Sequence, residues 1–246
     1  IIKLWCMNKK SNAVFDIGAN DGLDGLGFAL LNDNYYVYAF EANPELILKI
    51  KENKKKIENF FEIELNNYEI INKAVSNFNG FADFNISQHD LCSSLLPYKF
   101  VATKEKIKTE VITLEKFCIE RKIEAIIYIH IDTQGSDLDV LKGLASYRGK
   151  IHTGVMETMI HKKDTVYEGG SYYDDVISFF KKWQLDITKT EYNNYLKKEI
   201  NVYFSNNNNK NKNFRKFKKR FINRIITDKT NFKDFIYKTY LKKFIL

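Results

Sequence analysis

The chain has 246 residues, of which 44% are hydrophobic and 28% are charged. This balance excludes an intrinsically disordered chain, and 2 prolines with 11 glycines exclude a collagen-like or linker-rich design. Three scattered cysteines, Cys6, Cys92 and Cys118, form no C-x-x-C pair, so they predict neither a cysteine zinc site nor a redox pair. We interpret them as reduced thiols of a cytoplasmic protein.

The positive charge is concentrated at the C-terminal end. Residues 206–246 contain 13 Lys/Arg and 2 Asp/Glu, a net charge of +11, whereas the whole chain carries +8. Residues 1–205 therefore carry −3 and present no general case for binding nucleic acid.

Four apolar residues of the C-terminal segment recur at helical spacing between basic residues: Phe214, Phe217, Phe221 and Ile225. We therefore expect residues 206–246 to form a basic amphipathic helical tail. Such a helix can lie on an anionic membrane surface, which would place the protein peripherally at the inner membrane. Packing against the body, a protein partner or nucleic-acid phosphates are the alternative interpretations of the tail.

The rest of the chain alternates apolar strands with helical segments, a pattern typical of a parallel α/β sheet. Strands are expected at residues 13–17, 35–40, 68–75, 109–114, 125–132 and 154–159. Helices are expected at residues 24–31, 43–59, 115–122, 136–144 and 172–183. Residues 81–87 are expected to form a hairpin with the third strand, and residues 185–191 and 199–204 a closing antiparallel pair. We therefore predict a single α/β domain over residues 1–205.

A glycine-rich turn follows the first strand, in the segment Asp16-Ile17-Gly18-Ala19-Asn20-Asp21-Gly22. Gly18 allows a sharp turn and a close approach of a ligand to the backbone, and the free amides of the next helix then face that ligand. An ordinary strand-to-helix turn is the alternative. The turn is not the dinucleotide fingerprint G-x-G-x-x-G, because Asn20 and Leu23 replace its second and third glycines, which argues against a nicotinamide-dependent dehydrogenase.

Glu41 ends the second strand, 23 residues after Gly18. In a doubly wound sheet, an acid at this position lies beside the glycine turn and accepts hydrogen bonds from both hydroxyls of a ribose. An exposed acid in front of a helix is the alternative interpretation.

Polar side chains also end the most apolar strand, in the segment Tyr128-Ile129-His130-Ile131-Asp132-Thr133-Gln134-Gly135. Ligands of open α/β sheets bind outside the carboxyl ends of the strands. Asp132 and His130 are therefore candidate catalytic residues, although a histidine in a strand is more often a core residue. Glu157, at the end of the next strand, is a third candidate.

Five segments in register resemble the FkbM family of methyltransferases over about residues 13–204: residues 17–22, 39–44, 72–76, 93–95 and 131–143. The resemblance implies a Rossmann-like, doubly wound sheet of about seven strands, mostly parallel with one antiparallel closing strand. It also implies S-adenosylmethionine as the methyl donor and a hydroxyl of a sugar, glycan or other small molecule as the methyl acceptor.

The resemblance assigns roles residue by residue. The residues implied to bind the donor are Asp16, Gly18, Asn20, Asp21, Gly22, Glu41, Ala42, Asn43, Ala74, Val75 and Asp132. The residues expected to line the acceptor pocket are Ser93, Ser94 and Gln134. The family commonly has Asp-Val-Glu-Gly where this chain has Asp132-Thr133-Gln134-Gly135, so the chain lacks a second carboxylate there and we expect no bound metal.

The acceptor hydroxyl has to lose a proton during methyl transfer, and His130, Asp132, Glu157 and His161 are candidates for the base. A non-catalytic module that binds an adenosyl ligand is the remaining alternative, because Gln134 permits the loss of chemistry.

Overall fold

The structure of the chain is a computed structural model that describes residues 11–31, 34–88, 92–100, 102–164, 166–193 and 198–206. The chain divides into two units, residues 1–208 and 209–246. Most of the predicted basic tail, including the four apolar residues at helical spacing, lies outside the described residues. Among the described helices, none combines the length and apolar character needed to span a bilayer.

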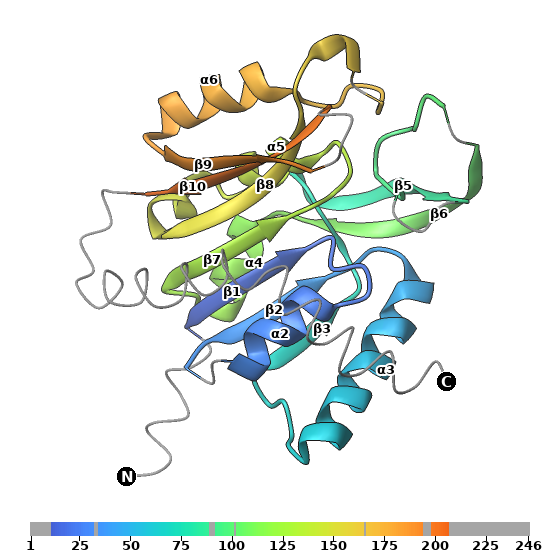
Figure 1. Cartoon of the computed structure of the whole chain (residues 1–246), viewed down its shortest axis with the longest axis vertical. Coiled ribbons are helices and arrows are strands. Elements are labelled where there is room, and N and C mark those ends of the chain that lie inside the picture. The colour runs from blue at the N-terminus through green and yellow to red at the C-terminus, as the bar shows by residue number, and fades with distance from the viewer. Residues whose placement is uncertain are drawn as a thin grey trace. The chain divides into compact units, whose positions relative to one another are not determined.

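The first unit is built on a seven-stranded sheet with the order β3-β2-β1-β7-β8-β10-β9 (Figure 1). Its strands are β1 (Asn12–Ile17), β2 (Tyr36–Phe40), β3 (Tyr68–Ile71), β7 (Ala125–Ile131), β8 (Thr153–Met159), β9 (Asp186–Tyr192) and β10 (Glu199–Ser205). Only β10 runs against the others, because it pairs antiparallel with both β8 and β9. The predicted mostly parallel sheet with one antiparallel closing strand is confirmed.

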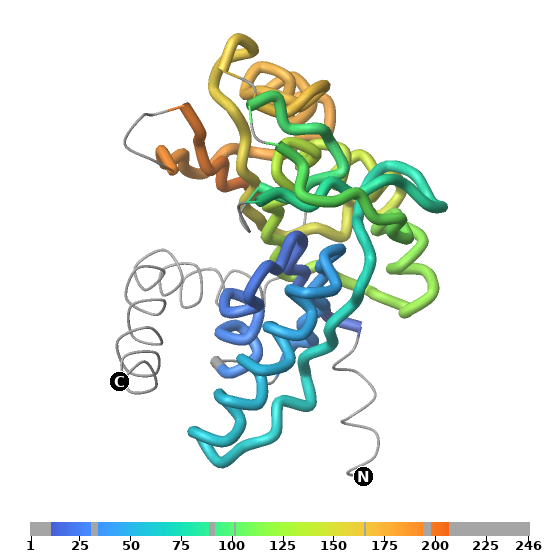
Figure 2. The backbone as a smooth tube through the Cα atoms, turned by 90° about the vertical axis from the view of Figure 1, so that its right-hand side faces the viewer, coloured from blue at the N-terminus to red at the C-terminus, as the bar shows by residue number. Residues whose placement is uncertain are grey.

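Helices cover both faces of this sheet (Figure 2). They are α2 (Leu23–Leu31), α3 (Pro44–Phe61), α4 (Leu114–Arg121), α5 (Asp137–Lys142) and α6 (Tyr173–Trp183), with short 3₁₀ turns η1 (Ala145–Lys150) and η2 (Lys162–Asp164). Alternate strand residues face opposite sides. Phe15 and Tyr38 pack on Phe117 of α4, whereas Tyr128 packs on Phe28 of α2.

A smaller three-stranded sheet, in the order β4-β6-β5, projects from the main one and consists of β4 (Ala74–Val75), β5 (Gly80–Ser87) and β6 (Thr103–Ile112). Two expectations are wrong here. Residues 68–75 are not one strand, because β3 ends at Ile71 and β4 belongs to the second sheet. The antiparallel partner of β5 is β6 rather than the third strand.

Asn72 provides the physical reason for the break between β3 and β4. Its side-chain amide donates hydrogen bonds to the carbonyl oxygens of Glu41 (2.9 Å) and Ala42 (3.2 Å), directly after β2. These bonds satisfy backbone groups where β2 leaves the sheet. They also turn the chain after Ile71, so that Ala74 and Val75 lie beside the end of β2.

The strand order reverses between β1 and β7, since β1 continues to β2 and β3 on one side and β7 continues to β8 on the other. Backbone bonds join the ends of these strands. Gly18 N donates to Phe40 O (3.0 Å), and Asp132 N donates to Ile17 O (2.9 Å). The polar segments after β1, β2 and β7 therefore meet at a topological switch point, where open α/β sheets bind their ligands.

Gly143 fixes how closely α5 approaches β4. A Cβ atom at Gly143 would lie 2.2 Å from the carbonyl oxygen of Ser76, which is a backbone atom. We therefore expect Gly143→Ala to lower the free energy of unfolding by about 1–3 kcal/mol, the usual cost of overpacking.

Gly149→Ala is the matched control, because a Cβ atom at Gly149 meets no atom within 4 Å. Urea denaturation of both variants measures the difference. Equal stabilities would show that α5 and β4 can separate freely.

Candidate active site

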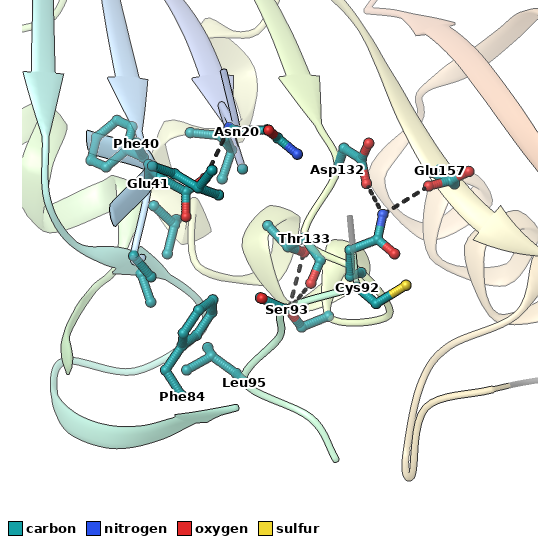
Figure 3. Close-up of a pocket in the computed structure, with 18 of the residues that line it drawn as sticks. Asn20, Phe40, Glu41, Phe84, Cys92, Ser93, Leu95, Asp132, Thr133 and Glu157 are labelled. Carbon is teal, nitrogen blue, oxygen red and sulfur yellow. Dashed lines mark hydrogen bonds between the residues drawn. The ribbon is translucent and has the colours of Figure 1, made fainter. Parts of the chain in front are cut away.

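A cavity of about 310 Å³ lies at the carboxyl ends of β1, β2 and β7 (Figure 3). Its walls come from the turn after β1, the end of β2, the second sheet, the segment around Ser93, and the segment after β7. Glu41 and Phe84 lie toward one end in Figure 3, and Asp132 and Glu157 toward the other. The volume lies within the range of small-molecule sites.

Glu41 is held rigidly at the first end of the cavity. The N–H of Asn20 donates to Glu41 Oε2 (2.9 Å), and the N–H of Asn43 donates to Glu41 Oε1 (2.8 Å). The residue is only 6% exposed, and this burial raises the pKa of its carboxyl to about 7. The N–H of Ala42 adds a third bond to this carboxyl, which keeps the capacity to accept a further hydrogen bond from a ligand.

Gly18 brings the turn after β1 against the end of β7. Its φ is +78°, and a Cβ atom there would lie 1.9 Å from the carbonyl oxygen of Asp132. Only glycine fits this close approach. The Gly18 turn therefore joins the Glu41 end of the cavity to its Asp132 end.

The wall around Glu41 is mostly apolar, a surface suited to a flat aromatic base. Ala74 and Val75 come from β4, and Phe84 comes from β5. The remaining apolar residues here are Phe40, Ala42, Leu46 and Leu95.

The other end of the cavity is acidic. It is lined by Asp132, Glu157 and Glu199, together with the amide side chains of Gln134 and Asn193. Nε2 of Gln134 lies 2.5 Å from Asp132 Oδ1 and 3.4 Å from Glu157 Oε2, and Asn193 Nδ2 donates to Glu157 Oε1. The amides thus supply donors to closely placed carboxyl groups.

Burial and the neighbouring carboxylate of Asp132 raise the pKa of Glu157 to about 9. Like charges this close are not ionised together at neutral pH. Burial and the adjacent Asp132 carboxylate therefore favour the protonated form of Glu157 at neutral pH.

This shift predicts a pH-dependent stability. The folded protein keeps the Glu157 proton that the unfolded chain releases above the ordinary pKa of 4.5. The stabilising contribution is therefore fully present below pH 4.5 and is lost as the pH rises to about 9, with a slope of up to about 1.4 kcal/mol per pH unit. We expect Glu157→Gln, which cannot ionise, to flatten the fall of the melting temperature between pH 5 and pH 9.

Scanning calorimetry across this pH range measures the effect, with Glu168→Gln at an exposed position as the control. Parallel curves for wild type and Glu157→Gln would contradict it.

The cavity collects most of the predicted site residues. Those that line it are Gly18, Asn20, Glu41, Ala42, Ala74, Val75, Ser93, Asp132, Gln134 and Glu157. Those that lie outside its lining are Asp16, Asp21, Gly22, Asn43, Ser94, His130 and His161.

Three of the residues outside the lining, Asp16, His130 and Asn43, make contacts that hold neighbouring strands and helices in place. Oδ1 of buried Asp16 lies 2.9 Å from His130 Nδ1, and its Oδ2 accepts the N–H of Gly25 in α2 (3.0 Å). Asn43 caps α3 by accepting the N–H of Glu45 (3.0 Å). These contacts favour structural roles for Asp16, His130 and Asn43.

Asp21 and Gly22 belong to the turn after β1 but do not line the cavity. Asp21 Oδ1 accepts the N–H of Leu23 (3.1 Å), and Gly22 lies against the side chains of Ile50 and Tyr68.

Ser94 holds the segment between β5 and β6 to the turn after β7. Its Oγ donates to Gln134 O (2.7 Å) and accepts the N–H of Leu96 (3.0 Å). Asp137, 2% exposed, holds the same turn by accepting the N–H groups of Thr133 (2.8 Å) and Gly135 (3.0 Å). Burial raises the pKa of Asp137 to about 7.

Several residues that line the cavity escaped the sequence reasoning: Phe84, Leu95, Lys73, Cys92, Asn193 and Glu199. Glu199 begins β10, and the others belong to the second sheet and to loops, where no periodic pattern marks the residues that point inward. Among the described residues, no group of three His, Cys, Asp or Glu side chains is arranged to hold a metal ion.

Comparison with known proteins agrees with this geometry. The family model "Methyltransferase FkbM domain" matches residues 16–196, which is more than half of the chain. "2-O-methyltransferase NoeI" of Sinorhizobium fredii (strain NBRC 101917 / NGR234) is 28% identical over 151 residues, 56% of this chain. The match spans 59% of that protein's length.

A crystal structure of methyltransferase FkbM from Methylobacillus flagellatus KT superposes with a TM-score of 0.53 at 12% identity. The match covers 79% of this chain and 44% of that one, and it supports the fold. The family match over residues 16–196 shows that the chain belongs to the FkbM family of methyltransferases, enzymes that take the methyl group from S-adenosylmethionine.

Proposed function

We propose that the protein transfers a methyl group from S-adenosylmethionine to a hydroxyl oxygen of a sugar, glycan or other small polyhydroxy compound. One observation carries the proposal: a single cavity joins a rigidly held carboxylate in an apolar wall, Glu41, to a second carboxylate, Asp132, among amide donors. The name of the relative NoeI, a 2-O-methyltransferase, supports transfer to oxygen.

The Glu41 end fits the adenosyl part of the donor. The carboxylate is oriented by backbone N–H groups, those of Asn20 and Asn43 among them, and can accept a hydrogen bond from the ribose hydroxyls. The apolar wall of Ala74, Val75 and Phe84 matches the faces of an adenine.

The Asp132 end fits the reacting hydroxyl. S-adenosylmethionine supplies an activated methyl group, so the protein's task is mainly to position the acceptor and remove its proton. Asp132 is the residue that we assign as the acceptor of this proton, because it lines the cavity directly beyond the end of β7, whereas burial favours the protonated form of Glu157. As the oxygen–carbon bond forms and the carbon–sulfur bond breaks, the hydroxyl proton passes to the Asp132 carboxylate.

Amide and carboxyl groups around Asp132 suit a neutral acceptor rich in hydroxyls. The amides of Gln134 and Asn193 and the protonated carboxyl of Glu157 can all bond to sugar hydroxyls. A small-molecule or glycan substrate follows from this surface. The cytoplasmic location, the membrane contact of residues 206–246 and the lack of nucleic-acid binding by the body stay predictions.

The experiment that tests the function supplies S-adenosylmethionine labelled in its methyl group to the full chain with a panel of methyl glycosides, amines and thiols. We expect label in at least one glycoside and none in the amines or thiols. Label in an amine or thiol would overturn transfer to oxygen. Donor binding by calorimetry without transfer to any acceptor would favour a non-catalytic adenosyl-binding module.

A further inference from the structure

Gln134 lies between the two carboxyl groups of the acidic end, with its Nε2 2.5 Å from Asp132 Oδ1 and 3.4 Å from Glu157 Oε2 (Figure 3). The Asp132 carboxylate only accepts hydrogen bonds, so the NH₂ group of the amide has to face it. The amide oxygen then points away from the carboxyl groups. A side-chain amide that turned over would instead set its oxygen against Asp132.

Tyr167 provides the partner that determines this orientation. Its hydroxyl donates to Gln134 Oε1 at 2.7 Å. Tyr167 is 4% exposed, and this burial raises the pKa of its hydroxyl, which therefore remains a protonated donor. Tyr167 thus donates a hydrogen bond to Gln134, and Gln134 in turn donates one to Asp132.

The backbone around Gln134 is shaped to seat Tyr167. Gln134 and Gly135 have φ values of +57° and +98°. A Cβ atom at Gly135 would lie 2.8 Å from the Tyr167 ring, so the absence of a side chain there lets the ring rest on the turn. The other side of the ring packs edge-on against Tyr98, with centroids 5.0 Å apart.

The segment that carries Tyr167 is itself anchored. The N–H of Lys99 donates to Val166 O, and the N–H of Glu168 donates to Pro97 O, both at 2.9 Å. A buried tyrosine between two backbone anchors has few alternative positions. The Tyr167 hydroxyl therefore has a well-defined position, and its hydrogen bond determines the orientation of the more flexible Gln134 side chain.

We propose that Tyr167 is a positioning residue of the methyl-transfer site, which orients the Gln134 amide so that its N–H groups hold the Asp132 carboxylate toward the acceptor hydroxyl. The inference rests on the proposed function for its catalytic part, whereas the orientation of the amide can be measured without an acceptor. Sequence patterns contain no sign of it, because Tyr167 comes from a loop 33 residues after Gln134.

The first test is a double-mutant cycle of Tyr167→Phe and Gln134→Ala, assayed on the glycoside that accepts label. We expect Tyr167→Phe to lower kcat about tenfold, the effect of one well-placed hydrogen bond, and to leave the Kd for S-adenosylmethionine unchanged. In the Gln134→Ala background the same change should have no further effect, since Tyr167 acts only through the amide. An equal loss in both backgrounds would overturn the proposal.

Tyr98→Phe is the matched control, because Tyr98 contacts the Tyr167 ring without a bond to Gln134, and kcat should keep its wild-type value. The second test needs no acceptor. The side-chain NH₂ resonance of Gln134, identified from its loss in Gln134→Ala, should exchange slowly with solvent in the wild type and at least tenfold faster in Tyr167→Phe.

An amide that exchanges rapidly in the wild type would overturn the positioning even if Tyr167→Phe failed to fold. If no glycoside accepts label, the proposed function fails, and the amide resonance still decides the orientation.

Discussion

Replacing Asp132 with asparagine will lower kcat by about 100-fold or more while the protein stays folded and binds its donor. A general base contributes about 10²–10⁴ to the rate, and asparagine cannot accept the hydroxyl proton. The shape of the side chain is preserved, and its amide oxygen can still accept from Gln134 Nε2. Donor binding should persist, because the ribose-binding carboxylate at Glu41 is untouched, and the loss in kcat should exceed any loss in donor affinity.

Initial-rate kinetics with the labelled donor, together with calorimetric donor binding, measure both quantities. Asp139→Asn is the matched control, since Asp139 lies on α5 outside the cavity lining and pairs with Lys142. It removes the same charge without touching the site. Wild-type turnover in Asp132→Asn would show that another group takes the proton.

Asp132→Asn also reveals the state of Glu157. The Asp132 charge is one cause of the raised Glu157 pKa, so its removal lowers that pKa from about 9. Glu157 then ionises more readily and becomes the nearest remaining base. The residual activity of Asp132→Asn should therefore rise with pH more steeply than that of the wild type.

The positions and the parallel direction of the main strands could be predicted because their residues are buried on both faces. The segments Val37–Phe40 and Ile126–Ile129 are apolar at every position. Such continuous apolar runs are typical of strands in a parallel sheet that is covered on both faces. The closeness of the glycine turn and Glu41 could also be predicted, because each directly follows one of two neighbouring parallel strands. The structure brings them within one hydrogen bond, from Asn20 N to Glu41 Oε2.

The second sheet could not be predicted for an equally physical reason. The first residues of β6, Thr103–Lys106, are polar and exposed, so the strand begins where no apolar alternation exists to indicate it. The break at Asn72 depends on side-chain bonds to the end of β2, which are tertiary contacts. Consequently the aromatic wall residue Phe84 was expected in a different hairpin.

Roles inferred from alternation alone were the least informative. His130 and Asp132 share a face of the chain, yet His130 lies within β7, with its ring against Asp16, while Asp132 lies beyond the strand's end at the cavity. The two-residue period gives the side of a sheet and not the depth along it. The distance of a side chain from the cavity depends on where the strand ends. Asp132 follows the last residue of β7 and lines the cavity, whereas His130, two residues earlier, lies inside the strand and does not.

The Tyr167–Gln134 contact gives a reason for the amide where the family commonly has glutamate. A carboxylate at position 134 would place a second negative charge against the Asp132 carboxylate, at the distance that the amide now bridges with a hydrogen bond. The amide instead donates to both carboxyl groups, which stabilises their close approach. Gln134 is therefore compatible with catalysis by Asp132 and does not by itself indicate a lost activity.

Replacing Glu41 with alanine will weaken donor binding about 10- to 100-fold, the effect of losing one or two hydrogen bonds of about 1–1.5 kcal/mol each. Titration calorimetry with S-adenosylmethionine measures the change, and Glu52→Ala on the exposed face of α3 controls for the lost charge. Unchanged affinity in Glu41→Ala would remove Glu41 from the site. Because alanine also leaves the N–H groups of Asn20 and Asn43 without a carboxylate, Glu41→Gln serves as the second variant.

The pH dependence of donor binding separates a ribose-binding carboxylate from a purely structural one. Burial raises the pKa of Glu41 to about 7 in the free protein. Only the ionised carboxyl acts solely as an acceptor toward the ribose hydroxyls, so wild-type affinity should increase as the pH rises through about 7 and then level off. Glu41→Gln cannot ionise and should show no such increase, whereas a carboxyl that only braces the Gly18 turn would leave the two binding curves parallel.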